Sequence, residues 1–232
     1  MSTLPEPADG GRDAEVAEAV HRVRGRLVAA CVAAGRPERE VTLIGVTKTF
    51  PVRDARRLLD AGVAELGESR EQEGGPKAAA LPSATWHFLG RLQANKAARV
   101  AGWADVLHTL DRAELVARLA RTERPPAVLV QVTLDGDPSR GGVPPADVVP
   151  LADAAAAAGL VVRGVMAVAP RDALPERAFE ALARVSARLR AAYDGATWIS
   201  AGMSGDLEAA VAHGATHVRI GSALLGERPP PV

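Results

Sequence analysis

The sequence is poor in several residue types, and each scarcity argues against a class of protein. Cys31 is the only cysteine among 232 residues, so the chain can form neither an intrachain disulfide nor a thiolate zinc cluster. Aromatic residues make up only 3%, which disfavours a platform for stacking nucleic-acid bases. The 28 basic and 28 acidic residues balance, so composition indicates neither a nucleic-acid surface nor a polybasic membrane patch.

Long apolar runs are also missing. The N-terminal stretch MSTLPEPADGGRDAE lacks the apolar core of a signal peptide. No segment approaches the ~20 apolar residues that a membrane-spanning helix needs. These absences predict a cytoplasmic protein without a membrane partner. The hydrophobic content of 47% is nevertheless enough for a substantial core.

Lysine is scarce as well, because only Lys48, Lys77 and Lys96 are lysines and all other basic residues are arginines. Arginine keeps its proton, whereas a lysine of lowered pKa becomes a nucleophile. Lys48 follows the apolar run VTLIGV (41–46) and precedes Pro51. An ammonium at the end of a buried strand is costly unless something uses it. Lys48 therefore either performs amine chemistry or extends its ammonium to the rim of a sheet.

The rest of the chain alternates between two kinds of segment. Residues 12–35 have helical spacing and predict a long amphipathic helix, preceded by a disordered lead over residues 1–11. Strand-like segments then alternate with helical ones. These segments are residues 41–48, 64–68, 84–90, 106–111, 127–134, 160–168, 197–203 and 217–221. We expect one domain over residues 12–228 and a tail over residues 229–232.

Alternating strands and helices predict parallel strands joined by right-handed crossovers. Eight such units in about 200 residues favour a closed (β/α)8 barrel of the TIM type, with an extra N-terminal helix. An open doubly wound sheet is the alternative, but the fingerprint GxGxxG is absent after the first strand. The predicted fold class is therefore α/β, a single barrel.

Functional residues of such barrels lie at the C-terminal ends of the strands. The last two strands end in the similar sequences AGMSGDLEA and RIGSALLG, which place glycine and serine where a strand turns into a helix. Exposed N–H groups, glycine and a hydroxyl suit an anion. Ser204 and Ser222 are alternatively plain helix caps. Two such loops, at the usual phosphate position of these barrels, favour a phosphate site.

In a closed barrel the eighth strand neighbours the first, so this phosphate site would lie beside Lys48. A reactive amine next to a phosphate site suits an aldehyde that carries a phosphate. Pyridoxal 5′-phosphate (PLP) is such a molecule. A sugar phosphate in an aldolase would use similar residues, and the residues alone leave both open.

Seven motifs resemble the pyridoxal phosphate homeostasis proteins, which are PLP-binding barrels related to the N-terminal domain of alanine racemase. The motifs are VTKTFP, GES, WHFLGRLQANK, HTLD, RGVMAV, AGMSGDLEAAVAHG and VRIGSALLG. The resemblance implies a protein of intracellular PLP homeostasis, in which Lys48 holds PLP as a Schiff base. It also implies that Ser204, Gly221 and Ser222 bind the phosphate and that Arg219 approaches the pyridine nitrogen.

The sequence departs from the family pattern in two places. The second strand ends in Ser69–Arg70 where relatives have an Asn–Tyr pair, although Ser69 can still donate a hydrogen bond to the cofactor. Arg140 replaces a lysine in the loop after the fifth strand, so it keeps the charge but cannot form a secondary Schiff base. We expect Met166, at the end of the sixth strand, to pack under the cofactor ring.

Other polar residues favour structural interpretations. We expect His87, between Trp86 and Phe88, to be a hydrogen-bonded structural histidine rather than an acid–base group. We interpret Asn95 and Lys96 as the solvated start of a helix, with a position facing the site as the alternative. No histidine has metal-ligand spacing with a carboxylate or cysteine, so we expect no metal.

Two functions share the predicted site: a PLP carrier and a PLP-dependent amino-acid racemase of weak activity. A racemase needs a second acid–base group opposite the lysine, which the related racemases take from a C-terminal domain of a partner subunit. The one tyrosine, Tyr193, lies late in a predicted helix, and the sequence ends soon after the eighth strand. The resemblance therefore favours a monomeric carrier without catalytic activity, with PLP and apo forms of PLP-dependent enzymes as partners.

Overall fold

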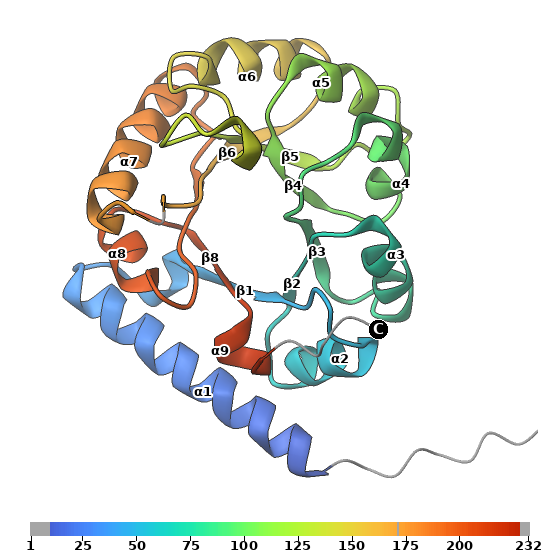
Figure 1. Ribbon diagram of the computed structural model, residues 1–232, viewed down its shortest axis with the longest axis vertical. Coiled ribbons are helices and arrows are strands. Elements are labelled where there is room, and N and C mark those ends of the chain that lie inside the picture. The colour runs from blue at the N-terminus through green and yellow to red at the C-terminus, as the bar shows by residue number, and fades with distance from the viewer. Residues whose placement is uncertain (1–9, 171, 228–232) are drawn as a thin grey trace, which may run out of the picture.

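The computed structural model describes residues 10–170 and 172–227, which form a closed barrel of eight parallel strands in chain order (Figure 1). The barrel closes because β8 pairs with β1, with Ile44 opposite Arg219 and Gly45 opposite Ile220. The predicted (β/α)8 fold is confirmed. The strands are β1 (Thr42–Val46), β2 (Glu65–Glu68), β3 (Thr85–Phe88), β4 (Val106–Leu110), β5 (Ala127–Gln131), β6 (Val162–Met166), β7 (Trp198–Ser200) and β8 (His217–Ile220).

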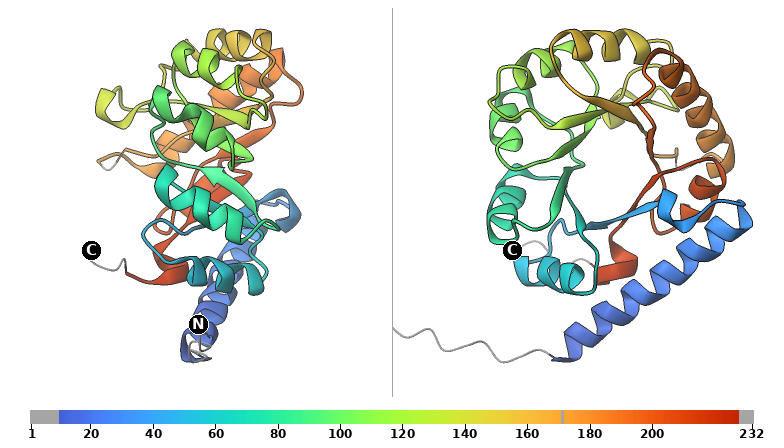
Figure 2. Two further views of the ribbon diagram at one scale, coloured as in Figure 1. Left: turned by 90° about the vertical axis from the view of Figure 1, so that its right-hand side faces the viewer. Right: turned by 180° about the vertical axis from the view of Figure 1, so that it is seen from behind.

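The helices that follow the strands form an outer ring around the barrel (Figure 1). They are α2 (Val52–Asp60), α3 (Glu71–Ala80), α4 (Ala97–Ala101), α5 (Ala113–Leu119), α6 (Val148–Ala157), α7 (Pro175–Ala192), α8 (Leu207–Ala212) and α9 (Ser222–Leu225). The described residues also form short 3-10 helices, which are η1 (Glu38–Glu40), η2 (Ala94–Lys96) and η3 (Pro138–Arg140). In the side view of Figure 2, η3 and α9 lie on the same side of the barrel, at which the strands end.

Strands covered by helices on one side and enclosed by the barrel on the other are buried on both faces, which explains their nearly continuous apolar sequences. All five residues of β4 are buried, for example. The glycines of α3 lower its helix propensity, but they have a packing reason. A Cβ at Gly74 would meet the ring of Trp103 at 2.3 Å, so only glycine lets that indole lie against the helix.

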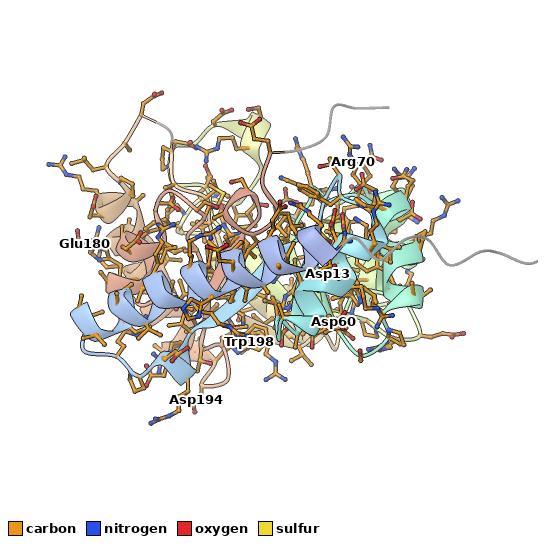
Figure 3. The ribbon with its side chains drawn as sticks, turned by 90° about the horizontal axis from the view of Figure 1, so that it is seen from below. Asp13, Asp60, Arg70, Glu180, Asp194 and Trp198 are labelled. Carbon is orange, nitrogen blue, oxygen red and sulfur yellow. The ribbon has the colours of Figure 1, made fainter. Side chains whose placement is uncertain are left out.

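The N-terminal helix α1 (Gly10–Ala33) confirms the expected extra helix and lies outside the ring, across α8, α9 and α2 (Figures 1 and 2). It begins two residues before the expected start and ends two residues earlier than expected. Residues 1–9 of the expected lead and the tail over residues 229–232 lie outside the described residues. Figure 3 shows α1 crossing the barrel with Asp13 near α2, where Asp13 pairs with Arg57 at 2.5 Å.

Arginines connect α1 and the turn after it to the C-terminal part of the barrel. Arg26 donates to the Ser204 carbonyl at 3.0 Å and to Glu208, and Arg12 donates to the Leu225 carbonyl at 2.6 Å. Arg36 donates to two carbonyls of the α8–β8 segment. The extra helix thereby holds the loops that carry Ser204 and α9. No helix within residues 10–170 and 172–227 has the length and apolar character to cross a membrane.

Because α1 packs on the barrel along one face, shortening a side chain of this helix should lower the free energy of unfolding only where that side chain is buried. Leu27 is 3% exposed and packs in the core, whereas Val32 on the same helix is 74% exposed. Leu27→Ala should lower the free energy of unfolding by roughly 2–5 kcal/mol because it leaves a cavity. Val32→Ala should change it by less than about 0.5 kcal/mol. Urea denaturation followed by circular dichroism measures both, and similar losses for the two variants would contradict the docking described here.

Candidate functional site

A cavity of about 260 Å³ lies at the C-terminal ends of the strands. Six of the seven predicted site residues line it: Lys48, Ser69, Ser204, Arg219, Gly221 and Ser222. These residues come from segments far apart in the sequence, which the closure of the barrel brings together. A phosphate site beside an amine is therefore geometrically possible in this structure.

Met166, the seventh predicted residue, does not line the cavity. It packs with Val106 and Leu129 inside the barrel, and Val168 lines the cavity instead. Side chains of an extended segment alternate between two faces, so residues 166 and 168 point to the same side at different depths. Met166 therefore lies deeper in the barrel than the residues that line the cavity, and its contact with a cofactor ring stays a prediction. Val168, two residues further along the extended segment, is the residue on that side whose side chain lines the cavity.

Two serines from different loops form one end of the cavity. The hydroxyl oxygens of Ser204, after β7, and Ser222, after β8, lie 3.4 Å apart. The backbone of Gly221 lies between β8 and α9 and lines the same cavity. Arg26 of α1 holds the Ser204 carbonyl, so the loop after β7 is fixed from outside the barrel. Both hydroxyls can therefore donate to one anion.

Ser69 lines the cavity from the end of β2, whereas its neighbour Arg70 is exposed and pairs with Glu73 at 3.2 Å. The Ser69 backbone is held against the loop after β3. A Cβ at Gly90 would meet the Ser69 carbonyl oxygen at 2.0 Å, so glycine is required there. Of the pair that departs from the family pattern, only Ser69 can contact a ligand in this cavity.

Arg219 is a buried cation at the base of the cavity. Its guanidinium donates to Ser200 Oγ at 2.6 Å and to the Ala167 carbonyl at 3.0 Å. No carboxylate of residues 10–170 and 172–227 lies within ion-pairing distance of it. Burial lowers the pKa of Arg219 to about 10, against the influence of Asp206, so the side chain stays charged at neutral pH. A buried guanidinium without a counter-ion is suited to bind an acceptor atom in the cavity.

Ser200 connects Arg219 to a chain of buried histidines. Ser200 Oγ lies 2.9 Å from His108 Nδ1, and His108 Nε2 lies 2.8 Å from His87 Nδ1. His87 Nε2 lies 2.6 Å from Glu65 Oε2, at the opposite end of the barrel, where the Glu65 side chain is partly exposed. The sequence did not indicate this chain, because its members are far apart in the sequence.

In this hydrogen-bonded series, the two end residues, Arg219 and Glu65, determine which group donates at each step. Arg219 can only donate, so Ser200 Oγ accepts from it, and the Glu65 carboxylate at the other end can only accept; with one N–H on each ring, the Ser200 hydroxyl donates to His108 Nδ1. His108 then donates through Nε2 to His87, and His87 donates through Nε2 to the Glu65 carboxylate. Burial lowers the pKa of His108 well below its usual value, which agrees with a neutral ring. The interpretation of His87 as a hydrogen-bonded structural residue is confirmed.

The remaining polar residues singled out by the sequence lie outside the cavity. Asn95 is exposed and Lys96 is half-buried on η2, and neither lines the cavity, as expected for a solvated helix start. Arg140 donates to the carbonyls of Val168 and Ala169, so it supports the cavity wall through the backbone. The Tyr193 hydroxyl donates to Asp153 of α6 on the outer ring.

The sequence of the chain is similar to those of known proteins. The family model for the N-terminal domain of alanine racemase matches residues 34–229. The pyridoxal phosphate homeostasis protein of Mycobacterium tuberculosis is 42% identical over 94% of each chain. The protein of the same name from Escherichia coli is 36% identical over 92% of this chain and 97% of that one.

Solved structures resemble the barrel as a whole. PipY of Synechococcus elongatus with PLP bound is 32% identical, with a TM-score of 0.79 over 91% of this chain and all of that one. Alanine racemase of Corynebacterium glutamicum is 17% identical, with a TM-score of 0.70 over 91% of this chain and 60% of that one. The second likeness shows the shared fold alone.

The buried histidines predict acid sensitivity. Burial lowers the pKa of His217 to about 3, and this ring stacks on Trp198 at a centroid distance of 4.1 Å. The unfolded chain, with a histidine pKa of about 6.5, therefore binds a proton that the folded chain does not, and stability is lost as the pH falls below about 6.5. By pH 5 the loss is about 2 kcal/mol for His217, and His108 acts in the same direction.

Urea denaturation of the wild type and of His217→Gln at pH 7 and pH 5 tests this expectation. The variant should lose about 2 kcal/mol less between the two pH values than the wild type, whatever its stability at pH 7. Taking the difference between the two proteins removes the contributions of all other titrating groups. Parallel pH profiles would show that the histidine is not held neutral by burial.

Proposed function

Because the chain belongs to the family of the alanine racemase N-terminal domain and, within it, to the pyridoxal phosphate homeostasis proteins, we propose that it binds PLP through the amine of Lys48. In this proposal the protein takes part in PLP homeostasis by holding the cofactor and releasing it to apo forms of PLP-dependent enzymes. A cytoplasmic location and a monomeric state belong to the same proposal.

The observation that carries the proposal is the donor set of the cavity. An amine, two serine hydroxyls and a buried guanidinium without a counter-ion line one space of about 260 Å³. This set fits PLP, which presents an aldehyde, a phosphate and a pyridine nitrogen. When bound, PLP supplies an aldehyde that condenses with a lysine amine and loses water.

Each residue then has one task. Lys48 would supply the amine that meets the aldehyde, and Ser204, Gly221 and Ser222, which line the same cavity, would hold the phosphate. Arg219 would donate to the pyridine nitrogen, and Ser69, just after β2, would offer a further hydroxyl donor. Since the guanidinium keeps its charge at neutral pH, it disfavours a second positive charge on the ring nitrogen. An unprotonated ring is a poorer electron sink.

The other residues around the cavity also favour a carrier. Racemisation needs a second acid–base group on the face opposite the lysine. Among the described residues that line the cavity, Lys48 and Arg219 are the ones with a titratable side chain. Tyr193, the one tyrosine of the sequence, is bound to Asp153 on the outer ring, and this hydrogen bond raises its pKa. No such group is therefore identified opposite Lys48 in the described part of the chain.

Covalent attachment at Lys48 is tested by variants of two lysines. The wild type mixed with PLP should develop a visible absorption band, and borohydride reduction followed by peptide mapping should place the cofactor on Lys48. Lys48→Ala should lose the band, whereas the matched control Lys96→Ala should keep it because Lys96 does not line the cavity. A reduced label on Lys96 or Lys77 would refute the assignment of Lys48.

The serine pair predicts that the phosphate provides much of the affinity. Pyridoxal, which lacks the phosphate, forgoes several charge-assisted hydrogen bonds, each contributing about 1.5–3 kcal/mol. Its dissociation constant should therefore exceed that of PLP by at least two orders of magnitude. In Ser204→Ala/Ser222→Ala the affinity for PLP should fall and that for pyridoxal should stay unchanged. Equal affinity of the wild type for the two aldehydes, measured by equilibrium dialysis, is incompatible with a phosphate site here.

A further inference from the structure

Two side chains of α3 hold the backbone on either side of Lys48. Lys77 Nζ donates to the carbonyl oxygen of Thr47 at 2.8 Å. The amide of Thr49 donates to Glu73 Oε2 at 2.7 Å. Lys77 and Glu73 lie one helical turn apart, and their charged groups are 3.8 Å from each other. The residue before Lys48 and the residue after it are thus both connected to one helix.

The backbone held in this way is strained. Thr49 has a φ of 70°, and it is the one non-glycine residue with a positive φ among residues 10–170 and 172–227. A β-branched side chain in the left-handed region is unfavourable, so such a conformation persists only where the surroundings enforce it. The hydrogen bond to Glu73 and that from Thr49 Oγ1 to the Lys48 carbonyl are such constraints. Strain of this kind typically marks a functional position.

Lys77 is anchored by a buried carboxylate. Its ammonium lies 2.5 Å from Glu68 Oε1, which also accepts from the Thr47 hydroxyl at 2.6 Å. Lys77 is 6% exposed and Glu68 is fully buried, and Glu68 Oε2 has no hydrogen-bond partner in the described structure. Burial raises the pKa of Glu68, although Lys77 opposes this effect.

A buried ion pair of this kind is a poor way to stabilise a fold, because well-packed apolar residues usually do so equally well. The Lys77–Glu68 pair does one thing that apolar residues cannot do, since it provides a donor aimed at the Thr47 carbonyl. A purely stabilising pair would not need to contact the backbone next to the site. The location of the pair therefore indicates a role in placing Lys48.

We propose that Lys77, anchored by Glu68 and acting together with Glu73, is a positioning residue that holds the turn over residues 47–49 so that the Lys48 amine enters the cavity. This inference rests on the proposed function, since it concerns how the Lys48 amine meets the PLP aldehyde. Lys77 itself does not line the cavity, and its ammonium donates to the Thr47 carbonyl instead. Two lysines close in space thereby have separate tasks.

The decisive experiment separates positioning from stability. Lys77→Met alone leaves the Glu68 carboxylate buried without a partner and should lower the melting temperature. Glu68→Gln/Lys77→Met removes both charges and should recover most of that loss, but it leaves the Thr47 carbonyl without its donor. Stopped-flow absorbance after mixing with PLP then measures how fast the visible band appears. The double variant should react roughly 10- to 100-fold more slowly than the wild type, because the amine is misplaced.

Glu73 provides a second pair of variants that retain the buried ion pair. Glu73→Gln keeps an oxygen that can accept from the Thr49 amide, whereas Glu73→Ala removes it. We expect Glu73→Gln to react with PLP like the wild type and Glu73→Ala to react about tenfold more slowly. Lys96→Met, a lysine change outside the cavity, is the matched control and should keep the rate of the wild type.

The outcomes are distinct. Wild-type rates in both Glu68→Gln/Lys77→Met and Glu73→Ala, with normal PLP binding by the wild type, would overturn the positioning role and leave the proposed function intact. A wild type that shows no visible band with PLP would overturn the proposed function and the positioning role with it. A slow double variant whose melting temperature equals that of the wild type supports positioning, because lost stability cannot then account for the slow reaction.

Discussion

The pairing of β8 with β1 is the constraint on which the candidate site depends. Without it, Lys48 would follow one edge strand, and Arg219, Gly221 and Ser222 would follow another. Parallel strands of a closed barrel all end on the same side, so a residue at the end of the first strand meets residues at the end of the last. The pairing of β7 with β8 places the hydroxyl of Ser204, in the neighbouring loop, 3.4 Å from that of Ser222.

A second consequence of closure is an interior that contains charge. Arg219 points into the barrel, where its guanidinium has no carboxylate within ion-pairing distance among the described residues, and a hydrogen-bonded chain leads from it to Glu65 at the far end. Burial of such groups is unfavourable unless hydrogen bonds satisfy them. Ser200, His108 and His87 provide these hydrogen bonds in a continuous series. The site is therefore supported along the whole length of the barrel.

Several residues that line the cavity were predictable because their signal is local. The end of an apolar strand, a lysine in an arginine-rich chain and two Gly–Ser turns identified Lys48, Ser204, Gly221 and Ser222. Met166 packs deeper in the barrel than the residues that line the cavity, and a motif that shows where a strand ends does not show how far a cavity reaches. The contacts of Lys77 and Glu73 with the Lys48 turn had no local signal, since they join residues 30 and 24 positions apart in two successive βα units.

The sequence by itself determined the order of eight strands and their helices, the extra N-terminal helix and the residue types that end each strand. These features follow from hydrophobic periodicity, local composition and turn residues, which are all properties of short segments. Only the tertiary structure decided which of these residues meet. It placed Lys77 under the Lys48 turn, enforced the positive φ of Thr49 and joined Arg219 to Glu65 through buried histidines. These features depend on how strands and helices pack in the closed barrel. Contacts between segments that are distant in the sequence produce no periodic pattern by which the sequence could predict them.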